Sequence, residues 1–260
     1  MADARPLILI PSFNTGPILL ATVESAVALK TPVWVIFDGS TDGSPETIAH
    51  LESAENSWFR IIRLPVNSGK GATVLYGLRE AISAGFTHVL TMDADGQHPA
   101  GKAGEFFQLS AEHPEAAVFG RPVFDEFAPA LRVNGRKISN FWANLETLGW
   151  GVDDSLFGMR LYPVHDLLAV MESTAYARRF DFDPEVAVRL AWRGVPIINL
   201  PTPVRYPSAE EGGVSQFRYC RDNTLLTWMH LRLFFGFVAR LPLLVGRGHN
   251  PLDHLSPPTR

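Results

Sequence analysis

The sequence predicts an α/β fold with a mostly parallel, Rossmann-like sheet and helices on both faces. A short apolar run, a polar loop and an amphipathic segment follow one another four times within residues 7–115. The apolar runs are nearly continuous, which is typical of strands buried on both faces of a parallel sheet. The 260 residues are 46% hydrophobic, enough for one large domain with a sizeable core.

The first half of the chain sets this pattern. Each apolar run predicts a strand, and the runs lie at residues 7–10, 33–37, 61–64, 87–92 and 116–119. Pro17, Ser44 with Pro45, and Pro99 are helix-start signals after three of the loops, because serine caps helices and proline suits the first turn. Gly85 closes the helix that follows the third strand.

The second half is less regular. We expect helices at 136–149 and 184–192, strands at 156–162 and 195–200, and a surface loop at 201–216, which is rich in Pro, Gly and Glu. The organisation we predict is a domain of residues 1–215, an amphipathic helical segment of residues 216–245 and a flexible tail of residues 246–260.

Four polar loops leave the carboxyl ends of the first four strands, at 11–16, 38–44, 65–71 and 93–98. Ligands of open parallel sheets bind at this edge, so we expect the loops to converge on one crevice. If Asp93 and Asp95 continue the strand before them, both carboxylates lie on one face. A divalent cation with oxygen ligands would relieve their repulsion and could hold nucleotide phosphates. The alternative is an ordinary turn and helix cap.

The other loops offer further candidates. Pro11 and Asn14 can present backbone and amide groups to a flat ring, and Asp38 can accept hydrogen bonds from a base or ribose. Gly69-Lys70-Gly71 precedes a helix, where backbone N–H groups and a cation favour phosphate. It lacks the spacing of a Walker loop. For each of these, the alternative is a structural turn or cap.

Composition limits the function classes. The net charge of −4 gives no reason to expect a nucleic-acid partner. Cys220 is the only cysteine and the N-terminus lacks the apolar core of a signal peptide, so we expect a reducing, cytoplasmic location. No uninterrupted apolar run of about 18 residues occurs, so we expect no membrane-spanning helix.

The segment 216–240 is amphipathic. At a helical period one side carries Arg218, Arg221, Asp222, Arg232 and Arg240, and the other carries Leu226, Trp228, Leu231, Phe234, Phe235, Phe237 and Val238. This pattern is typical of a helix in a membrane interface, where arginine can reach the headgroups. It is equally typical of a helix packed on a core.

The four loop motifs, in order, resemble the signature of family 2 glycosyltransferases. They are Pro-Ser-Phe-Asn, Phe-Asp-Gly-Ser-Thr-Asp-Gly-Ser, Asn-Ser-Gly-Lys-Gly-Ala and Met-Asp-Ala-Asp-Gly-Gln-His-Pro. The branch they most resemble is that of dolichol-phosphate mannose synthase and other polyprenyl-phosphate glycosyltransferases. The resemblance covers residues 6–125 and continues more loosely to Glu185. The family often has two acids where this chain has Phe37-Asp38, and a Glu where it has Thr15.

The resemblance implies a fold of the glycosyltransferase A type and an inverting, metal-dependent transfer. The metal would be Mg²⁺ or Mn²⁺ on Asp93, Asp95 and Gln97. The donor would be a UDP- or GDP-linked sugar, and the acceptor a lipid phosphate at the inner face of the membrane. The implied donor-binding residues are Pro11, Phe13, Asn14, Asp38, Gly69, Lys70, Asp93 and Ala94. Arg121 would face phosphates, and Arg132 or Arg136 would bind the acceptor.

Two other functions stay open. A hydroxyl acceptor on a glycan, lipid or small molecule would require a carboxylate base, for which Asp183 and Glu185 are the candidates. A non-catalytic, membrane-peripheral module that binds nucleotide sugars is the alternative of another class, and the intact Asp93 and Asp95 argue against it.

Overall fold

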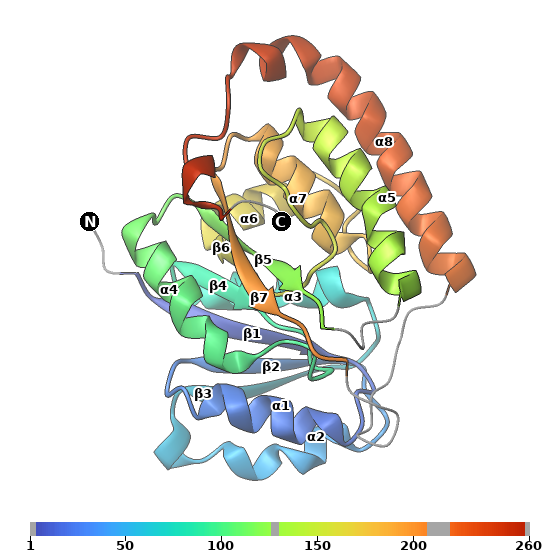
Figure 1. Cartoon of the computed structure of the whole chain (residues 1–260). Coiled ribbons are helices and arrows are strands. Elements are labelled where there is room, and N and C mark those ends of the chain that lie inside the picture. The colour runs from blue at the N-terminus through green and yellow to red at the C-terminus, as the bar shows by residue number, and fades with distance from the viewer. Residues whose placement is uncertain (1–3, 126–129, 207–218, 258–260) are drawn as a thin grey trace.

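The computed structural model describes residues 4–125, 130–206 and 219–257, without the side chains of residues 54, 130–132, 219 and 220. A seven-stranded sheet in the order β3-β2-β1-β4-β6-β5-β7 forms its centre (Figure 1). β6 is antiparallel to β4 and β5, and the other neighbours are parallel. The strands are β1 (Pro6–Ser12), β2 (Val33–Asp38), β3 (Phe59–Leu64), β4 (His88–Thr91), β5 (Ala117–Val123), β6 (Arg160–Pro163) and β7 (Ile197–Pro203).

Helices cover both faces of the sheet and enclose two hydrophobic cores. One core packs α1 and α4 on the sheet, and the other packs α3, α5, α6, α7 and α8. The helices are α1 (Ile18–Val27), α2 (Ser44–Thr47), α3 (Lys70–Ser83), α4 (Ala103–Glu112), α5 (Ala130–Thr147), α6 (Val164–Glu172), α7 (Phe182–Trp192) and α8 (Tyr219–Gly246). Short 3₁₀ turns lie at Ala49–Leu51, Ala54–Asn56, Ala100–Lys102 and Asp253–Leu255. The predicted α/β class with helices on both faces is therefore confirmed.

Apolar patterning explains the central strands. Every residue of β2 and β4 is buried, as the continuous apolar runs predict. Gly77 lets α3 approach the sheet closely, because a Cβ there would lie 2.6 Å from Cδ1 of Ile36 and 2.8 Å from Cδ1 of Leu9. Close packing of α3 brings its first residue, Lys70, to the carboxyl ends of β1 and β2.

The strand expected at 156–162 is shorter and begins only at Arg160. The residues before it form a turn, because Oδ1 of Asp154 accepts the N–H groups of Leu156 (2.9 Å) and Phe157 (2.7 Å). A side chain that takes up these donors competes with strand pairing. The apolar pattern of residues 156–162 could not show that the side chain of Asp154 would take these N–H groups.

The described part of the tail differs from the flexible segment that we expected. Nδ2 of Asn250 donates to the carbonyl of Ile197 in β7 (2.6 Å), and the N–H of Asn199 donates to Oγ of Ser256 (2.9 Å). The tail therefore lies along β7. Of the expected loop 201–216, residues 201–203 belong to β7, and residues 207–216 lie outside the described residues.

α8 packs beside α5 and α7 at one side of the molecule (Figure 1). Met229, Leu233 and Phe237 of α8 are buried. Its outer side is apolar and exposed, with Trp228 50%, Phe235 66% and Leu243 75% exposed. The two expectations for this segment, packing on the core and an exposed apolar side, thus describe opposite sides of one helix.

Candidate active site

A cavity of about 1380 Å³ opens at the carboxyl ends of β1, β2 and β4. One wall, the strand-end wall, comes from the loops after these strands and from the start of α3. Its residues include Pro11, Phe13, Asp38, Gly69, Lys70, Asp93, Ala94, Asp95 and Gln97. The opposite wall, the helix wall, comes from α5 and α8. Its residues include Arg136, Ile138, Ser139, Trp142, Leu226, His230, Leu231 and Phe234. The predicted convergence of the loops on one crevice is confirmed.

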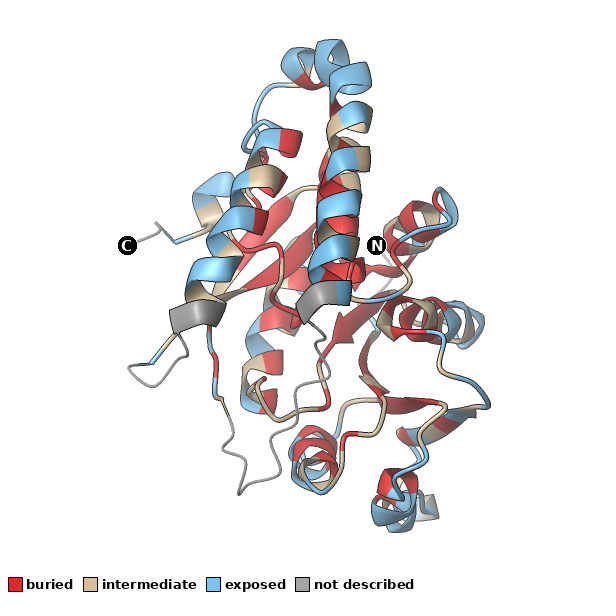
Figure 2. Cartoon of the chain, turned by 90° about the vertical axis from the view of Figure 1, so that its right-hand side faces the viewer, coloured by how far each residue is buried: buried red, intermediate tan, exposed pale blue. Residues whose placement is uncertain are grey.

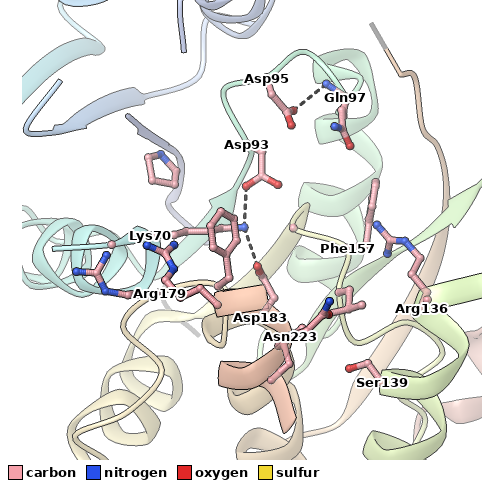
Figure 3. Close-up of a pocket in the computed structure, with 18 of the residues that line it drawn as sticks. Lys70, Asp93, Asp95, Gln97, Arg136, Ser139, Phe157, Arg179, Asp183 and Asn223 are labelled. Carbon is pink, nitrogen blue, oxygen red and sulfur yellow. Dashed lines mark hydrogen bonds and ion pairs between the residues drawn. The ribbon is translucent and has the colours of Figure 1, made fainter. Parts of the chain in front are cut away.

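Lys70 lies between two carboxylates in this cavity (Figure 3). Its Nζ is 2.7 Å from Oδ1 of Asp93 and 2.7 Å from Oδ2 of Asp183. Burial alone would lower the pKa of Lys70, but the two acids raise it above its ordinary value. The two acids therefore share the single ammonium group of Lys70.

The two acids differ in their ionisation. Burial alone would raise the pKa of Asp93, but Lys70, His98 and Arg136 together hold it below its ordinary value. Burial dominates at Asp183 and raises its pKa, although Lys70 and Arg160 oppose this. Asp93 is therefore the carboxylate that stays ionised most readily, as a metal ligand must.

His98 holds the backbone of Asp93 in place. The backbone N–H of Asp93 donates to Nδ1 of His98 (2.9 Å), so the neutral ring carries its hydrogen on Nε2. Burial lowers the pKa of His98 to about 4, which keeps the ring neutral near pH 7. The structural role of His98, fixing the turn after β4, follows from this bond.

The side-chain oxygens of Asp93, Asp95 and Gln97 are of the kind that bind a divalent cation. Asp95 closes the turn, since its Oδ1 accepts the N–H of Gln97 (3.1 Å), and all three side chains line the cavity. Carboxylate and amide oxygens are the ligands that Mg²⁺ and Mn²⁺ prefer. Within the described ranges, no group of three or more His, Cys, Asp and Glu could hold a metal. Oxygen atoms of water or of a ligand's phosphates would complete the coordination.

Gly158 makes room for the charged cluster. A Cβ at this position would clash with Oδ2 of Asp93 and lie 2.7 Å from Nζ of Lys70. Any side chain here would displace the acid or the cation. The site therefore requires a glycine at position 158. This position lies in the part of the chain where the resemblance to family 2 glycosyltransferases is looser.

Asp38 supports the Gly-Lys-Gly loop. Its Oδ1 accepts the N–H of Ser68 (2.8 Å) and its Oδ2 accepts the N–H of Gly69 (2.7 Å). These two N–H groups are therefore engaged by the protein, which differs from the phosphate cradle that we expected of the loop. Gly69 also packs closely, because a Cβ there would lie 2.5 Å from the carbonyl oxygen of Arg178.

Three of the predicted site residues do not line the cavity. Arg121 pairs with Asp153 (3.0 Å) and donates to the carbonyl of Pro257 (2.8 Å). Glu185 is fully buried between Arg189 (2.8 Å) and Arg232 (2.9 Å).

Asn14, the third, holds the next loop, since its Oδ1 accepts the N–H of Thr41 (2.8 Å). Asp183 and Arg136 do line the cavity. The side chain of Arg132 lies outside the described residues.

Two arginines of the cavity were missed by the sequence reasoning. Arg179, beside the start of α7, and Arg221 of α8 both line it. Lys70, Arg136, Arg179 and Arg221 thus surround the cavity with cations, as a site for phosphates requires. The signal in the sequence was the Arg178-Arg179 pair just before Phe180-Asp181.

Exposed apolar side chains lie on the outer sides of α5 and α8, and Figure 2 shows that the outer sides of both helices carry exposed residues. We call these outer sides together the α5–α8 face. Its residues are Ile138, Phe141, Leu145 and Leu148 of α5 and Trp228, Leu231, Phe235, Val238, Leu241, Leu243 and Val245 of α8. Ile138 and Leu231 also line the cavity, so this face continues into the helix wall. Exposed apolar side chains gathered on two neighbouring helices are typical of an interaction site.

Arg232 is placed differently from our expectation. It was expected to reach membrane headgroups, but it bonds Glu185 and lies over the ring of Tyr176, 3.5 Å from its centroid. Arg218 lies outside the described residues. By length and composition α8 could cross a membrane from Arg221 to Gly246, which the search for an uninterrupted apolar run missed. Its buried ion pair with α7 ties it to the domain instead.

The model of the glycosyl transferase family 2 matches residues 7–165, which include β1 to β6 and the paired acids. The chain belongs to glycosyl transferase family 2. This glycosyltransferase is 24% identical, over 212 residues, to an undecaprenyl-phosphate mannosyltransferase of Micrococcus luteus, covering 76% of this chain and 82% of the relative. It is 24% identical, over 203 residues, to a polyprenol monophosphomannose synthase of Mycolicibacterium smegmatis, covering 76% of each.

Solved structures agree on the fold of the glycosyltransferase. Glucosyl-3-phosphoglycerate synthase from Mycobacterium tuberculosis, in complex with Mn²⁺, UDP and phosphoglyceric acid, superposes with a TM-score of 0.64 at 17% identity, covering 91% of this chain and 78% of that one. S. aureus TarS 1–349, in complex with UDP-GlcNAc, gives 0.55 at 13% identity, covering 94% and 79%. The glycosyltransferase A type of fold is thereby confirmed.

Proposed function

We propose that this glycosyltransferase transfers a sugar from a nucleotide sugar to the phosphate of a polyprenyl phosphate, with a divalent metal, at the cytoplasmic membrane surface. The observation that carries the proposal is the two-sided cavity. Its strand-end wall is charged. Its helix wall carries Arg136, Ser139 and His230 among apolar side chains, and these apolar side chains continue into the exposed α5–α8 face. A phosphorylated lipid likewise has a charged headgroup and an apolar chain. The names of the two relatives, a polyprenyl-phosphate mannosyltransferase and a polyprenol monophosphomannose synthase, support this acceptor class.

The donor side rests on the strand-end wall. Asp93 and Asp95, with Gln97, would hold Mg²⁺ or Mn²⁺, and the bound metal would supply positive charge to the diphosphate of a UDP- or GDP-linked sugar. Lys70 and Arg179 line the same cavity and can neutralise the charge that develops on the leaving nucleoside diphosphate. Pro11 and Phe13 offer an apolar surface to the base.

The acceptor side explains why no strong base is needed. A lipid phosphate is already an anion, so its oxygen can attack the sugar carbon without losing a proton, with inversion at that carbon. Arg136 lines the cavity and can hold this phosphate. For a hydroxyl acceptor, a base would have to take the proton, and Asp183 is the one of our two candidate acids that lines the cavity.

The α5–α8 face supports the membrane part of the proposal through its charge. Glu146 and Asp222, the acids of the two helices, are buried, while Lys137, Arg221 and Arg240 are exposed. Apolar side chains flanked by cations suit an anionic lipid surface. A second copy of this chain would bring like charges together at the rim of the same face.

The direct test of the acceptor class is a comparison of two lipids. Purified protein with a nucleotide sugar and Mg²⁺ or Mn²⁺ is incubated with a polyprenyl phosphate or the matching polyprenol, and the products are identified by mass spectrometry. We expect a glycosylated product with the phosphate alone. Product from the alcohol alone would establish the hydroxyl acceptor, and metal-dependent donor binding without any transfer would favour the non-catalytic module.

Vesicle flotation tests the membrane part. We expect binding to anionic vesicles that weakens with salt, and weaker binding for the pair Lys137→Gln and Arg240→Gln. The matched control is the pair Lys30→Gln and Arg63→Gln, which removes the same charge from exposed positions outside α5 and α8. Equal loss in both pairs, or no binding of the unaltered protein, would overturn this part.

A further inference from the structure

A buried chain of polar side chains joins α5 to α8 within the helix wall. Nδ1 of His230 lies 3.1 and 3.2 Å from the two carboxylate oxygens of Glu146. On the other side of the ring, Nε2 of His230 lies 3.0 Å from Oγ of Ser139, which lies 3.0 Å from Oγ of Ser155. Oγ of Ser155 in turn lies 2.8 Å from Oδ1 of Asn140. None of these groups is used by the proposed transfer.

The orientation of Asn140 is fixed by its neighbours. Its Nδ2 donates to Oδ2 of Asp154 (3.2 Å), and its Oδ1 accepts the backbone N–H of Ser155 (2.8 Å). A flipped amide would bring oxygen against the carboxylate and N–H against N–H. Oδ1 of Asn140 is therefore an acceptor at the end of the chain.

Hydrogen counting then determines the state of His230. Three contacts, from Nε2 to Ser139, from Ser139 to Ser155 and from Ser155 to Asn140, each need one hydrogen. The two serine hydroxyls supply only two, and Asn140 supplies none. The third hydrogen must lie on Nε2, so His230 donates to Ser139, Ser139 donates to Ser155, and Ser155 donates to Asn140.

The contact with Glu146 needs a further hydrogen. Nδ1 of His230 faces the carboxylate, so either the ring is doubly protonated or Glu146 is protonated and donates to a neutral ring. In both cases the pair holds one proton more than a neutral imidazole beside a carboxylate. Burial raises the pKa of Glu146, the hydrogen bond from His230 lowers it, and the charge of Glu185 raises it, with the net direction upward.

The direction of the chain excludes one interpretation. Glu146, His230 and Ser139 have the composition of a hydrolase triad, in which the serine donates its hydrogen to the imidazole. Here the hydrogen of Ser139 points to Ser155 instead, so the hydroxyl is not activated as a nucleophile. The chain is suited to holding groups in position.

Beyond Asn140 the chain reaches a cation of the cavity. Asp154 accepts from Nδ2 of Asn140 through Oδ2 and from Arg136 through Oδ1 (2.7 Å). We propose that the Glu146–His230 pair retains its extra proton in the folded enzyme and, through this chain, positions Arg136 for the acceptor phosphate. The positioning role rests on the proposed function, whereas the retained proton does not.

The other charged side chains near the Glu146–His230 pair each have a partner of opposite charge. From α7, Glu185 is the neighbouring acid, and it is neutralised by Arg189 and by Arg232 of α8. At the other end of the chain, Asp154 is paired with Arg136. Deprotonation of the pair would leave one of the three contacts without a hydrogen, and the direction of the hydrogen bonds among His230, Ser139 and Ser155 would be lost.

The retained proton can be measured without any substrate. We expect ¹⁵N NMR of the histidine-labelled full chain to show the Nε2 of His230 protonated at pH 7. The signal is assigned by its loss in His230→Gln or, should that variant not fold, by its shift in Ser139→Ala. An unprotonated Nε2 with hydrogen on Nδ1 would overturn the hydrogen count, whichever acceptor the enzyme uses.

The positioning role is tested by kinetics with the polyprenyl phosphate. Ser139→Ala removes the link in the chain, and we expect the acceptor KM to rise about 5- to 20-fold, the range of a lost hydrogen bond to a charged network, with the donor KM unchanged. Thr147→Ala is the matched control, because Thr147 is buried in the same helix and its hydroxyl bonds, among the described residues, to carbonyls of that helix. Equal rises in both variants would overturn the role.

A pH profile separates positioning from packing. In the unaltered enzyme we expect the acceptor KM to rise at alkaline pH, where the pair loses its proton. In Glu146→Gln the amide can donate to Nδ1 and keep the hydrogen on Nε2, so the KM should stay constant with pH. The same alkaline rise in both proteins would contradict the role of the pair. Absence of any transfer to a phosphate acceptor would refute the proposed function and leave the NMR result standing.

Discussion

The two walls of the cavity are built in different ways. In the strand-end wall, functional side chains lie within a few residues of a strand end, and some are held by neighbours in sequence, as His98 holds the N–H of Asp93. In the helix wall, the partners are remote in sequence, as Ser139 and His230 are, 91 residues apart. The comparison teaches that local motifs carry the residues proposed to bind the donor, whereas the packing of α5 against α8 creates the surface proposed for the acceptor.

The largest effect that this comparison predicts is at Asp95. Asp95→Asn removes the charge of one proposed metal ligand, and we expect transfer to fall by at least about 10²-fold, the usual loss for one electrostatic group at a reacting centre. Metal-dependent donor binding should weaken in calorimetry while the melting temperature without metal stays close to that of the unaltered protein. Full transfer by this variant would remove Asp95 from the metal site.

A second effect concerns pH and the fold of the strand-end wall. The pKa of His98 falls from 6.5 to about 4 on folding, so the folded state binds fewer protons between these values. This contribution to stability is complete above pH 6.5 and is lost as the pH falls toward 4. We expect a loss of about 2 kcal/mol between pH 7.5 and pH 5 from this group.

Denaturant unfolding of the metal-free protein at the two pH values measures this loss. In His98→Asn the amide oxygen can accept the N–H of Asp93 and cannot titrate, so the pH dependence should flatten. Equal pH dependence in both proteins would show that another group is responsible.

The third effect tests how closely the chain packs around the carboxylate of Asp93 and the ammonium group of Lys70. Gly158→Ala places a Cβ against Asp93 and Lys70, and we expect kcat/KM to fall about 10²-fold, as small displacements of reacting groups do. Gly104→Ala in α4 is the control, because a Cβ there meets nothing within 4 Å. Similar activities of the two variants would contradict the close packing of the cluster.

The fourth effect belongs to the helix wall alone. Leu231→Gln replaces an apolar side chain that lines the cavity and is 47% exposed, so the fold should tolerate it. We expect the KM for a long polyprenyl phosphate to rise about tenfold, from lost apolar contact, and the KM for the donor to stay constant. A short prenyl phosphate, which does not reach along the wall, should be little affected. Equal changes for both acceptors would argue against the helix wall as the lipid site.

The residues of the strand-end wall could be predicted from the sequence, whereas the pairings that involve the packed helices could not, and the reason is physical. The paired acids, Lys70 and Asp38 lie at the ends of apolar runs, where strand and loop alternate regularly, so their convergence follows from the sheet. The pairings of Arg121 with Asp153, of Glu185 with Arg232 and of Ser139 with His230 depend on which helices pack together. No local pattern encodes that packing, and Gly158 gains its meaning only when Asp93 lies against it.

The central claim is that an anionic acceptor attacks without a general base, and Asp183→Asn tests it most directly. Asn keeps a hydrogen-bond acceptor for Lys70 at the same place but cannot take a proton. With a phosphate acceptor, we expect the rate of transfer in single-turnover kinetics to fall less than about tenfold, with donor binding intact. A loss of about 10²–10⁴-fold, the range for removal of a general base, would contradict the claim.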